Sequence, residues 1–201
     1  MVVGPVGYGS LTGRVYVCTK TARGWQQSAE LQGPGGSNGG RFGYSVAIAG
    51  TTIVVGSIGP GAYAGRAYVF SDTSTGWQQV AELEGSDTVY DDFGLSVAIS
   101  GTTIVVGAPV DNSETGRVHV FRQTATDWHQ TAELNGSDSA NGDYFGNSVA
   151  ISGNTVVGGA PVNDFDTGRA YVFTRTATGW QQTAELKGCR EPNAAYFHAA
   201  S

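Results

Sequence analysis

Acidic side chains cluster in the stretch before two of the chain's Gly-Arg pairs, where their spacing could hold a cation. The residues concerned are Asp111, Glu114, Asp164 and Asp166. Several carboxylate oxygens within one short loop are the ligands that Ca²⁺ prefers. Asp and Asn also bond to the backbone of their own turns, and we prefer this solubilising turn role for these residues. A weak cation site is the alternative.

A second charged pattern pairs arginine with glutamate once in each repeat of the chain. The arginines are Arg14, Arg66, Arg117 and Arg169, and the glutamates are Glu30, Glu82, Glu133 and Glu185. Their parallel recurrence favours an ion pair or a backbone clamp between neighbouring strands. A ring of arginines that recognises an anion is disfavoured, because the net charge is −6.

Catalytic chemistry has little support in the sequence. His119 stands where other repeats carry a tyrosine, and His129 replaces a glutamine on a polar strand face. No unique set of nucleophile, base and acid breaks the repeat. We therefore predict that the chain is not an enzyme and binds no cofactor.

The elements that position these residues repeat about every 52 residues, the interval between Trp25, Trp77, Trp128 and Trp180. A period of this length is typical of one supersecondary unit repeated along the chain. We place the units at 1–41 (partial), 42–92, 93–144 and 145–196, with 197–201 as the degenerate start of a further unit.

Each unit contains four short segments rich in β-branched and aromatic residues, separated by turn residues. Thr52–Gly56 is apolar without alternation, which predicts a strand buried on both faces. In the last segment Trp77, Ala81 and Leu83 alternate with polar residues, which predicts an outer strand with one wet face and each Trp packed on its own strand's Leu and Ala. We predict an all-β fold: a β-propeller of about four four-stranded antiparallel blades, forming a ring or an arc of a larger one.

The order Phe93-Gly94, then Gly107-Ala108-Pro109, resembles the FG-GAP repeat, which builds the propeller of integrin α chains and of many secreted bacterial proteins. The stretch 136–146 is most similar to the bacterial form. The resemblance implies a Ca²⁺ loop of the type Asp-x-Asp-x-Asp-Gly between the first two strands. Here that connection is Ser100–Thr103, without a carboxylate, so the family's ligands do not carry over. Ca²⁺ binding stays possible, but its usual cage is absent.

Composition narrows the range of partners. The 11 Lys and Arg residues form no basic cluster, which disfavours nucleic acid. No apolar run is long enough to insert into a membrane. No signal peptide is visible, but the chain opens inside a strand, so we interpret it as lacking upstream sequence; the family implies an extracellular or cell-surface location. Cys18 stands at a core phenylalanine position and Cys189 in a loop, and we expect free thiols.

The function we expect is a non-enzymatic extracellular binding or adhesion module that presents loops to a protein or glycan. One alternative is a lectin-like propeller with a pocket in each blade. Its aromatic candidates are Tyr63, Tyr90, Tyr144 and Phe165. A second alternative is a structural or accessory domain of a larger secreted enzyme. We also expect all four tryptophans to be mostly buried, and a weak closure between residues 1–4 and the tail 197–201.

Overall fold

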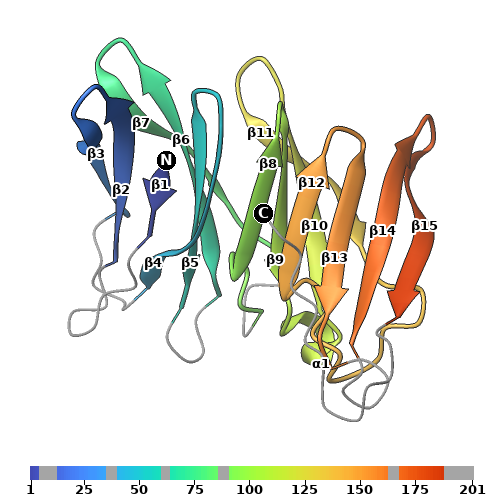
Figure 1. The fold of residues 1–201 in the computed structure, drawn as a ribbon. Coiled ribbons are helices and arrows are strands. Elements are labelled where there is room, and N and C mark those ends of the chain that lie inside the picture. Colours follow the sequence, from blue (N-terminus) through green and yellow to red (C-terminus); the bar gives the residue numbers. More distant parts are fainter. Residues whose placement is uncertain (5–12, 35–39, 60–63, 86–90, 163–167, 188–201) are drawn as a thin grey trace.

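The computed structural model describes residues 1–4, 13–34, 40–59, 64–85, 91–162 and 168–187. These residues form four antiparallel sheets that stand side by side in a row (Figure 1). We call the sheets blades 1 to 4, in chain order. The predicted all-β, propeller-type architecture is confirmed. In Figure 1 blades 1 and 4 lie at opposite ends of the row.

Blade 1 has three strands and each later blade has four, joined in simple up-and-down order. Blade 1 consists of β1 (Val2–Val3), β2 (Arg14–Thr21) and β3 (Gly24–Gln32). Blade 2 consists of β4 (Arg41–Ala49), β5 (Thr52–Ile58), β6 (Arg66–Thr73) and β7 (Gly76–Leu83). Blade 3 consists of β8 (Ser96–Ser100), β9 (Thr103–Ala108), β10 (Arg117–Gln123) and β11 (Trp128–Leu134). Blade 4 consists of β12 (Ser148–Ser152), β13 (Thr155–Ala160), β14 (Arg169–Thr176) and β15 (Gly179–Lys187). A single helical turn, α1 (Asp111–Glu114), precedes β10.

The order of strands within a blade follows their hydrophobic pattern. The strands that begin with Thr-Ile-Val-Val, β5 and β9, are buried along nearly their whole length, as predicted. The tryptophan strands β3, β7, β11 and β15 form the outer edges, also as predicted. Tight turns join the first two strands of blades 2 to 4. Gly101, with a φ of 56°, opens the turn in blade 3 in the left-handed conformation that glycine tolerates best.

A β-bulge in every blade corrects our expectation for the tryptophan strand. The pairing register shifts between Val69 and Phe70 of β6, so Val80 of β7 is an extra residue. One inserted residue moves the rest of the strand to the other face of the sheet. Trp77 therefore packs against blade 1, whereas Leu83 packs against blade 3. The expectation that each Trp packs on the Leu and Ala of its own strand is wrong.

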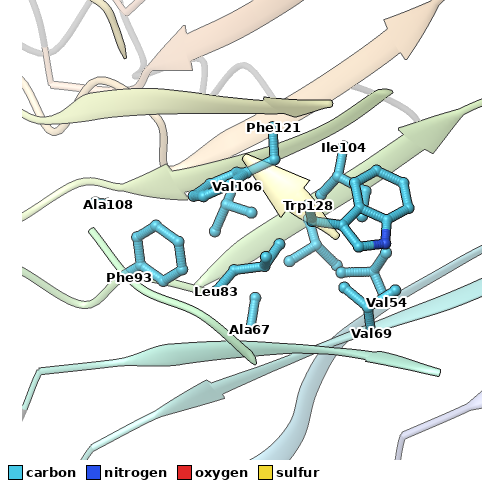
Figure 2. Packing of buried hydrophobic residues seen from close by; sticks show 11 residues of the cluster. Val54, Ala67, Val69, Leu83, Phe93, Ile104, Val106, Ala108, Phe121 and Trp128 are labelled. Carbon is cyan, nitrogen blue, oxygen red and sulfur yellow. The ribbon is translucent and has the colours of Figure 1, made fainter. Parts of the chain in front are cut away.

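The bulge gives each blade two different apolar faces. We call the face toward the preceding blade the leading face and the face toward the following blade the trailing face. Figure 2 shows how they meet between blades 2 and 3: Val54, Val69 and Leu83 from the trailing face of blade 2 pack against residues of blade 3. The blade 3 residues in this cluster include Phe93, Ile104, Val106, Phe121 and Trp128. Equivalent clusters join blades 1 and 2 and blades 3 and 4.

Blade-to-blade packing is close enough for backbone to touch backbone. A Cβ built on Gly107 of β9 would lie 1.9 Å from the carbonyl oxygen of Gly146 in blade 4. The same relation holds between Gly56 of blade 2 and Gly94 of blade 3, at 2.0 Å. Gly4 of blade 1 and Gly43 of blade 2 are placed likewise, at 2.2 Å, so the glycines of the Val-Val-Gly and Phe-Gly motifs face each other across all three interfaces. The glycines of these two motifs therefore allow neighbouring blades to pack closely.

The tryptophans differ in burial, so the expectation that all four are mostly buried is wrong. Trp128 is 7% exposed, Trp77 and Trp180 are half-buried, and Trp25 is 55% exposed. The reason is position, because a tryptophan on the leading face needs a preceding blade to cover it. Cys18, expected in the core, is likewise half-buried on blade 1, and it is a free thiol. Cys189 and the tail 197–201 lie outside the described residues.

Candidate functional site

The connections between strands differ sharply at the two ends of the blades (Figure 1). At one end every connection is a short hairpin turn, such as residues 50–51, 101–102 and 153–154. At the other end the connections span residues 4–13, 33–40, 59–65, 84–95, 109–116, 135–147 and 161–168. We call this the long-loop end. An up-and-down order of strands puts all connections of one kind at one end, and exposed loops on a rigid scaffold commonly carry function.

The repeated arginines and glutamates lie near the long-loop end, where each pair bridges the last two strands of one blade. Arg66 Nε lies 2.9 Å from Glu82 Oε1, and Arg117 Nη1 lies 3.3 Å from Glu133 Oε2. Arg14 contacts Glu30, and Arg169 contacts Glu185, in the same way. The predicted cross-strand ion pair is confirmed in all four blades. At the partly exposed positions of blades 1 to 3 each pair contributes about 0–1 kcal/mol.

Blade 3 departs from this pattern because a histidine replaces the repeated tyrosine. His119 is fully buried, and its Nε2 lies 3.7 Å from Oδ2 of Asp111. Its Nδ1 lies 3.8 Å from Oε1 of Glu133. The ring packs edge-on against Phe93, with centroids 5.2 Å apart. The predicted strand position of His119 is confirmed, and His129 lies exposed on β11, also as predicted.

The structure separates the four cation-loop candidates. Asp111 is only 3% exposed, with Oδ2 3.6 Å from Nε of Arg117. The solubilising role that we preferred for Asp111 is therefore wrong, because the carboxylate is buried between an arginine and a histidine. Glu114 is exposed, with a positive φ of 65°, and its carbonyl oxygen accepts a hydrogen bond from the backbone N–H of Tyr144. Asp164 and Asp166 lie outside the described residues.

Within the described ranges no group of three or more His, Cys, Asp or Glu side chains could hold a metal ion. The neighbours of Asp111 also disfavour a cation, because Arg117 already places a positive charge beside its carboxylate. Among the described residues, Asp111 and the side chains around it thus form a buried charged cluster.

Blade 4 has a related network that the sequence did not reveal. The hydroxyl of Tyr171 donates a hydrogen bond of 2.6 Å to Oδ1 of Asp138, and Arg169 contacts both Asp138 and Glu185. Burial is the main reason that the pKa of Tyr171 lies above its usual value, and the hydrogen bond to Asp138 acts in the same direction. In both networks the aspartate comes from a long connection. Asp111 lies in the connection 109–116, and Asp138 lies in the connection 135–147.

Asp91 fastens blade 2 to blade 3 at the long-loop end. It is 1% exposed, and its Oδ1 accepts hydrogen bonds from the backbone N–H groups of Gly65 (3.2 Å) and Phe93 (3.1 Å). Burial raises the pKa of Asp91 above its usual value of 3.8, although both hydrogen bonds act in the opposite direction. Asp91, which stands two residues before the Phe93-Gly94 pair, is therefore a structural carboxylate.

An apolar groove of about 310 Å³ runs along the inner strands. Residues of β1, β4, β8 and β12 line it, including Val46, Val97 and Ile151. Its lining side chains are all apolar and include no acid, base or nucleophile.

Of the aromatic residues considered for a lectin-like pocket, only Tyr144 lies in the described residues, where it is half-buried. The side-chain hydrogen bond with Glu114 is the main reason that the pKa of Tyr144 lies above its usual value. Tyr63, Tyr90 and Phe165 lie outside the described residues. No helix among the described residues is long and apolar enough to span a membrane.

Comparison with known proteins gives a family but no close relative. A search of curated proteins found no match. Among solved structures, the chain is similar to Sqt1 from Saccharomyces cerevisiae, with 12% identity and a TM-score of 0.47. It is also similar to Sqt1 from Chaetomium thermophilum, with 16% identity and a TM-score of 0.48. In both comparisons 71% of this chain matches 35% of the other.

The model of the FG-GAP repeat matches this chain three times, over residues 25–70, 77–121 and 128–173. Each match begins at the tryptophan of one blade and ends at or near the third strand of the next. Each matched segment therefore contains one blade-to-blade junction, with its Phe-Gly pair and its facing glycines. The chain belongs to the FG-GAP repeat family.

Proposed function

We propose that this chain is a non-enzymatic binding module that acts outside the cell or on its surface and contacts a partner through the long-loop end. The observation that supports this best is the segregation of connections, with tight turns at one end and all the longer connections at the other. Blades locked together by facing glycines form a rigid base for such loops.

The recurrent charged residues support a structural role for the packed blades and a binding role for the long loops. The arginine of every blade is paired with the glutamate of the same blade, and His119 lies buried between carboxylates. A buried or paired group is badly placed to attack a substrate. Exposed loop residues, such as Glu114 and Asn135, are placed to contact a partner.

The proposal is tested by adhesion to surfaces coated with the chain. We expect saturable attachment of cells or of extracellular-matrix proteins that soluble chain competes away. Glu114→Lys, at the long-loop end, should weaken attachment several-fold. Asp72→Lys is the matched control, because Asp72 is an exposed acid next to a short turn. Equal loss in both variants, or no attachment to any coated surface, would contradict the proposal.

A lectin-like function is the second candidate, and half-buried Tyr144 beside Glu114 is the described feature that favours it. Retention of the chain on an immobilised glycan array, lost in Tyr144→Ala and kept in Asp72→Lys, would support this candidate over protein adhesion. An aromatic side chain that anchors a ligand typically costs more than about 1 kcal/mol of binding energy when it is truncated, and we expect a loss of this size.

A further inference from the structure

The two end blades expose residues whose counterparts are buried or half-buried at the internal interfaces. The trailing-face leucine is 4% exposed in blade 1, 2% in blade 2 and 4% in blade 3, as Leu31, Leu83 and Leu134. Its counterpart in blade 4, Leu186, is 51% exposed. Val157 and Val172 of the same face are half-buried, whereas the corresponding residues of blade 3, Val105 and Val120, are almost completely buried.

The leading face of blade 1 shows the complementary exposure. Trp25 is 55% exposed, against 7% for its counterpart Trp128. Val3 is 44% exposed, whereas its counterparts Val55 and Val106 are fully buried. This chain therefore carries both halves of its own blade-to-blade interface, uncovered, at opposite ends of the row (Figure 1).

These two faces match each other because they are repeats of faces that already pack together. A leading face meets a trailing face three times inside the chain, in the clusters between blades 1 and 2, 2 and 3, and 3 and 4. A fourth contact of the same kind would cover Trp25 with a trailing face and Leu186 with a leading face. Within one chain this contact is not made, because both residues stay exposed.

We propose that a second copy of the chain provides this contact, head to tail. The leading face of blade 1 in one copy packs on the trailing face of blade 4 in the other, and the same contact forms a second time. Two heterologous contacts then close a ring of two copies, which removes both uncovered faces. The resulting eight blades fall within the usual size of a propeller.

The test uses two variants, each of which disables one face. Sedimentation of the unaltered chain should give a mass about twice its 20.8 kDa. Trp25→Asp disables the leading face and Leu186→Asp disables the trailing face, so each variant alone should sediment as a monomer. An equimolar mixture should recover a dimer, because one copy keeps an intact leading face and the other an intact trailing face.

The control is Val80→Asp, because Val80 is 48% exposed at the bulge of β7 and lies on neither end blade. This variant should remain dimeric. Circular dichroism and thermal unfolding of each variant show that a monomer is folded. A monomeric unaltered chain at all soluble concentrations would overturn the proposal. Dimers that persist in either single variant, or a mixture that stays monomeric, would also overturn it.

Discussion

The hydroxyl of Ser96 donates a hydrogen bond of 2.8 Å to the carbonyl oxygen of Gly146, the glycine of the next blade's Phe-Gly pair. Ser45 makes the same bond to Gly94, also at 2.8 Å. The serine that follows each Phe-Gly thus fastens the inner strand of one blade to the motif of the next. This contact gives a physical reason for the recurrence of the serine together with the Phe-Gly pair.

Replacement of Ser96 by alanine should therefore weaken the junction of blades 3 and 4. We expect a loss of about 0.5–1.5 kcal/mol in the free energy of unfolding, the usual contribution of one hydrogen bond. Urea unfolding measures this loss. Ser152→Ala, at an exposed position of β12, is the control and should change stability by less than about 0.5 kcal/mol. Equal effects in both variants would contradict the role of Ser96.

A larger effect is expected for Gly107→Ala. The new Cβ would lie 1.9 Å from the carbonyl oxygen of Gly146, and backbone cannot move aside as a flexible side chain can. We expect a loss of about 1–3 kcal/mol or more from overpacking. At Gly101 an added Cβ meets nothing within 4 Å, so Gly101→Ala reports only the cost of its positive φ, about 1 kcal/mol. A smaller loss at Gly107 than at Gly101 would contradict the close-approach argument.

The same repeat position should give opposite results at Trp128 and Trp25. Trp128 lies in the cluster between blades 2 and 3, so its replacement by alanine should cost about 3–5 kcal/mol (Figure 2). Trp25→Ala, measured at concentrations where the chain is monomeric, should cost less than about 1 kcal/mol. Urea unfolding of the two variants side by side checks this difference, and equal losses would mean that Trp25 is covered in solution.

The repeat period and the strand patterns were sufficient to predict the blades, their outer strands and the Arg–Glu pairs. Strand alternation could not predict the faces correctly, because one bulge residue, Val80 in blade 2, reverses the sides of Trp77 and Leu83. A bulge leaves no separate signal in an apolar-polar pattern. Only the similar bulge position in all four blades shows that it is part of the repeat.

The charged residues of the long loops were the least predictable. Asp91, Asp111 and Asp138 all stand in polar, turn-rich sequence, yet they contact Gly65, Arg117 and Tyr171 respectively. The partners of Asp91 and Asp138 lie 26 and 33 residues away in the sequence, so these two carboxylates reach them only in the folded chain. Arg117 follows Asp111 within the same blade. Local sequence cannot distinguish such carboxylates from ones that face water, because their burial depends on how the chain packs around them.

Asp91 should give the chain a measurable pH dependence. Its folded pKa is raised above 3.8 by burial, so in the range just above 3.8 the folded state binds a proton that the unfolded state has released. The resulting stabilisation is complete below 3.8 and is lost as the pH rises through the folded pKa. The unaltered chain should thus gain stability relative to Asp91→Asn as the pH is lowered from about 7 to about 4.

Urea unfolding of both proteins at each pH measures this difference. Asp72→Asn, at an exposed position, is the control for the removal of one carboxylate. A relative stability that falls on acidification would contradict the burial argument, because it would mean that the two backbone hydrogen bonds outweigh desolvation.

Calcium should have little effect on stability. Asp111 already lies 3.6 Å from the guanidinium of Arg117, so a cation there would have to overcome that positive charge. We expect the unfolding temperature to differ by no more than about 2 °C between EDTA and millimolar Ca²⁺, since 1 kcal/mol of binding energy shifts it by about 2–4 °C in a chain of this size. Asp111→Asn should instead destabilise by about 1–3 kcal/mol with or without Ca²⁺, because it removes the buried carboxylate charge beside Arg117. A large Ca²⁺-dependent rise that is lost in Asp111→Asn would show that this carboxylate binds a cation in solution.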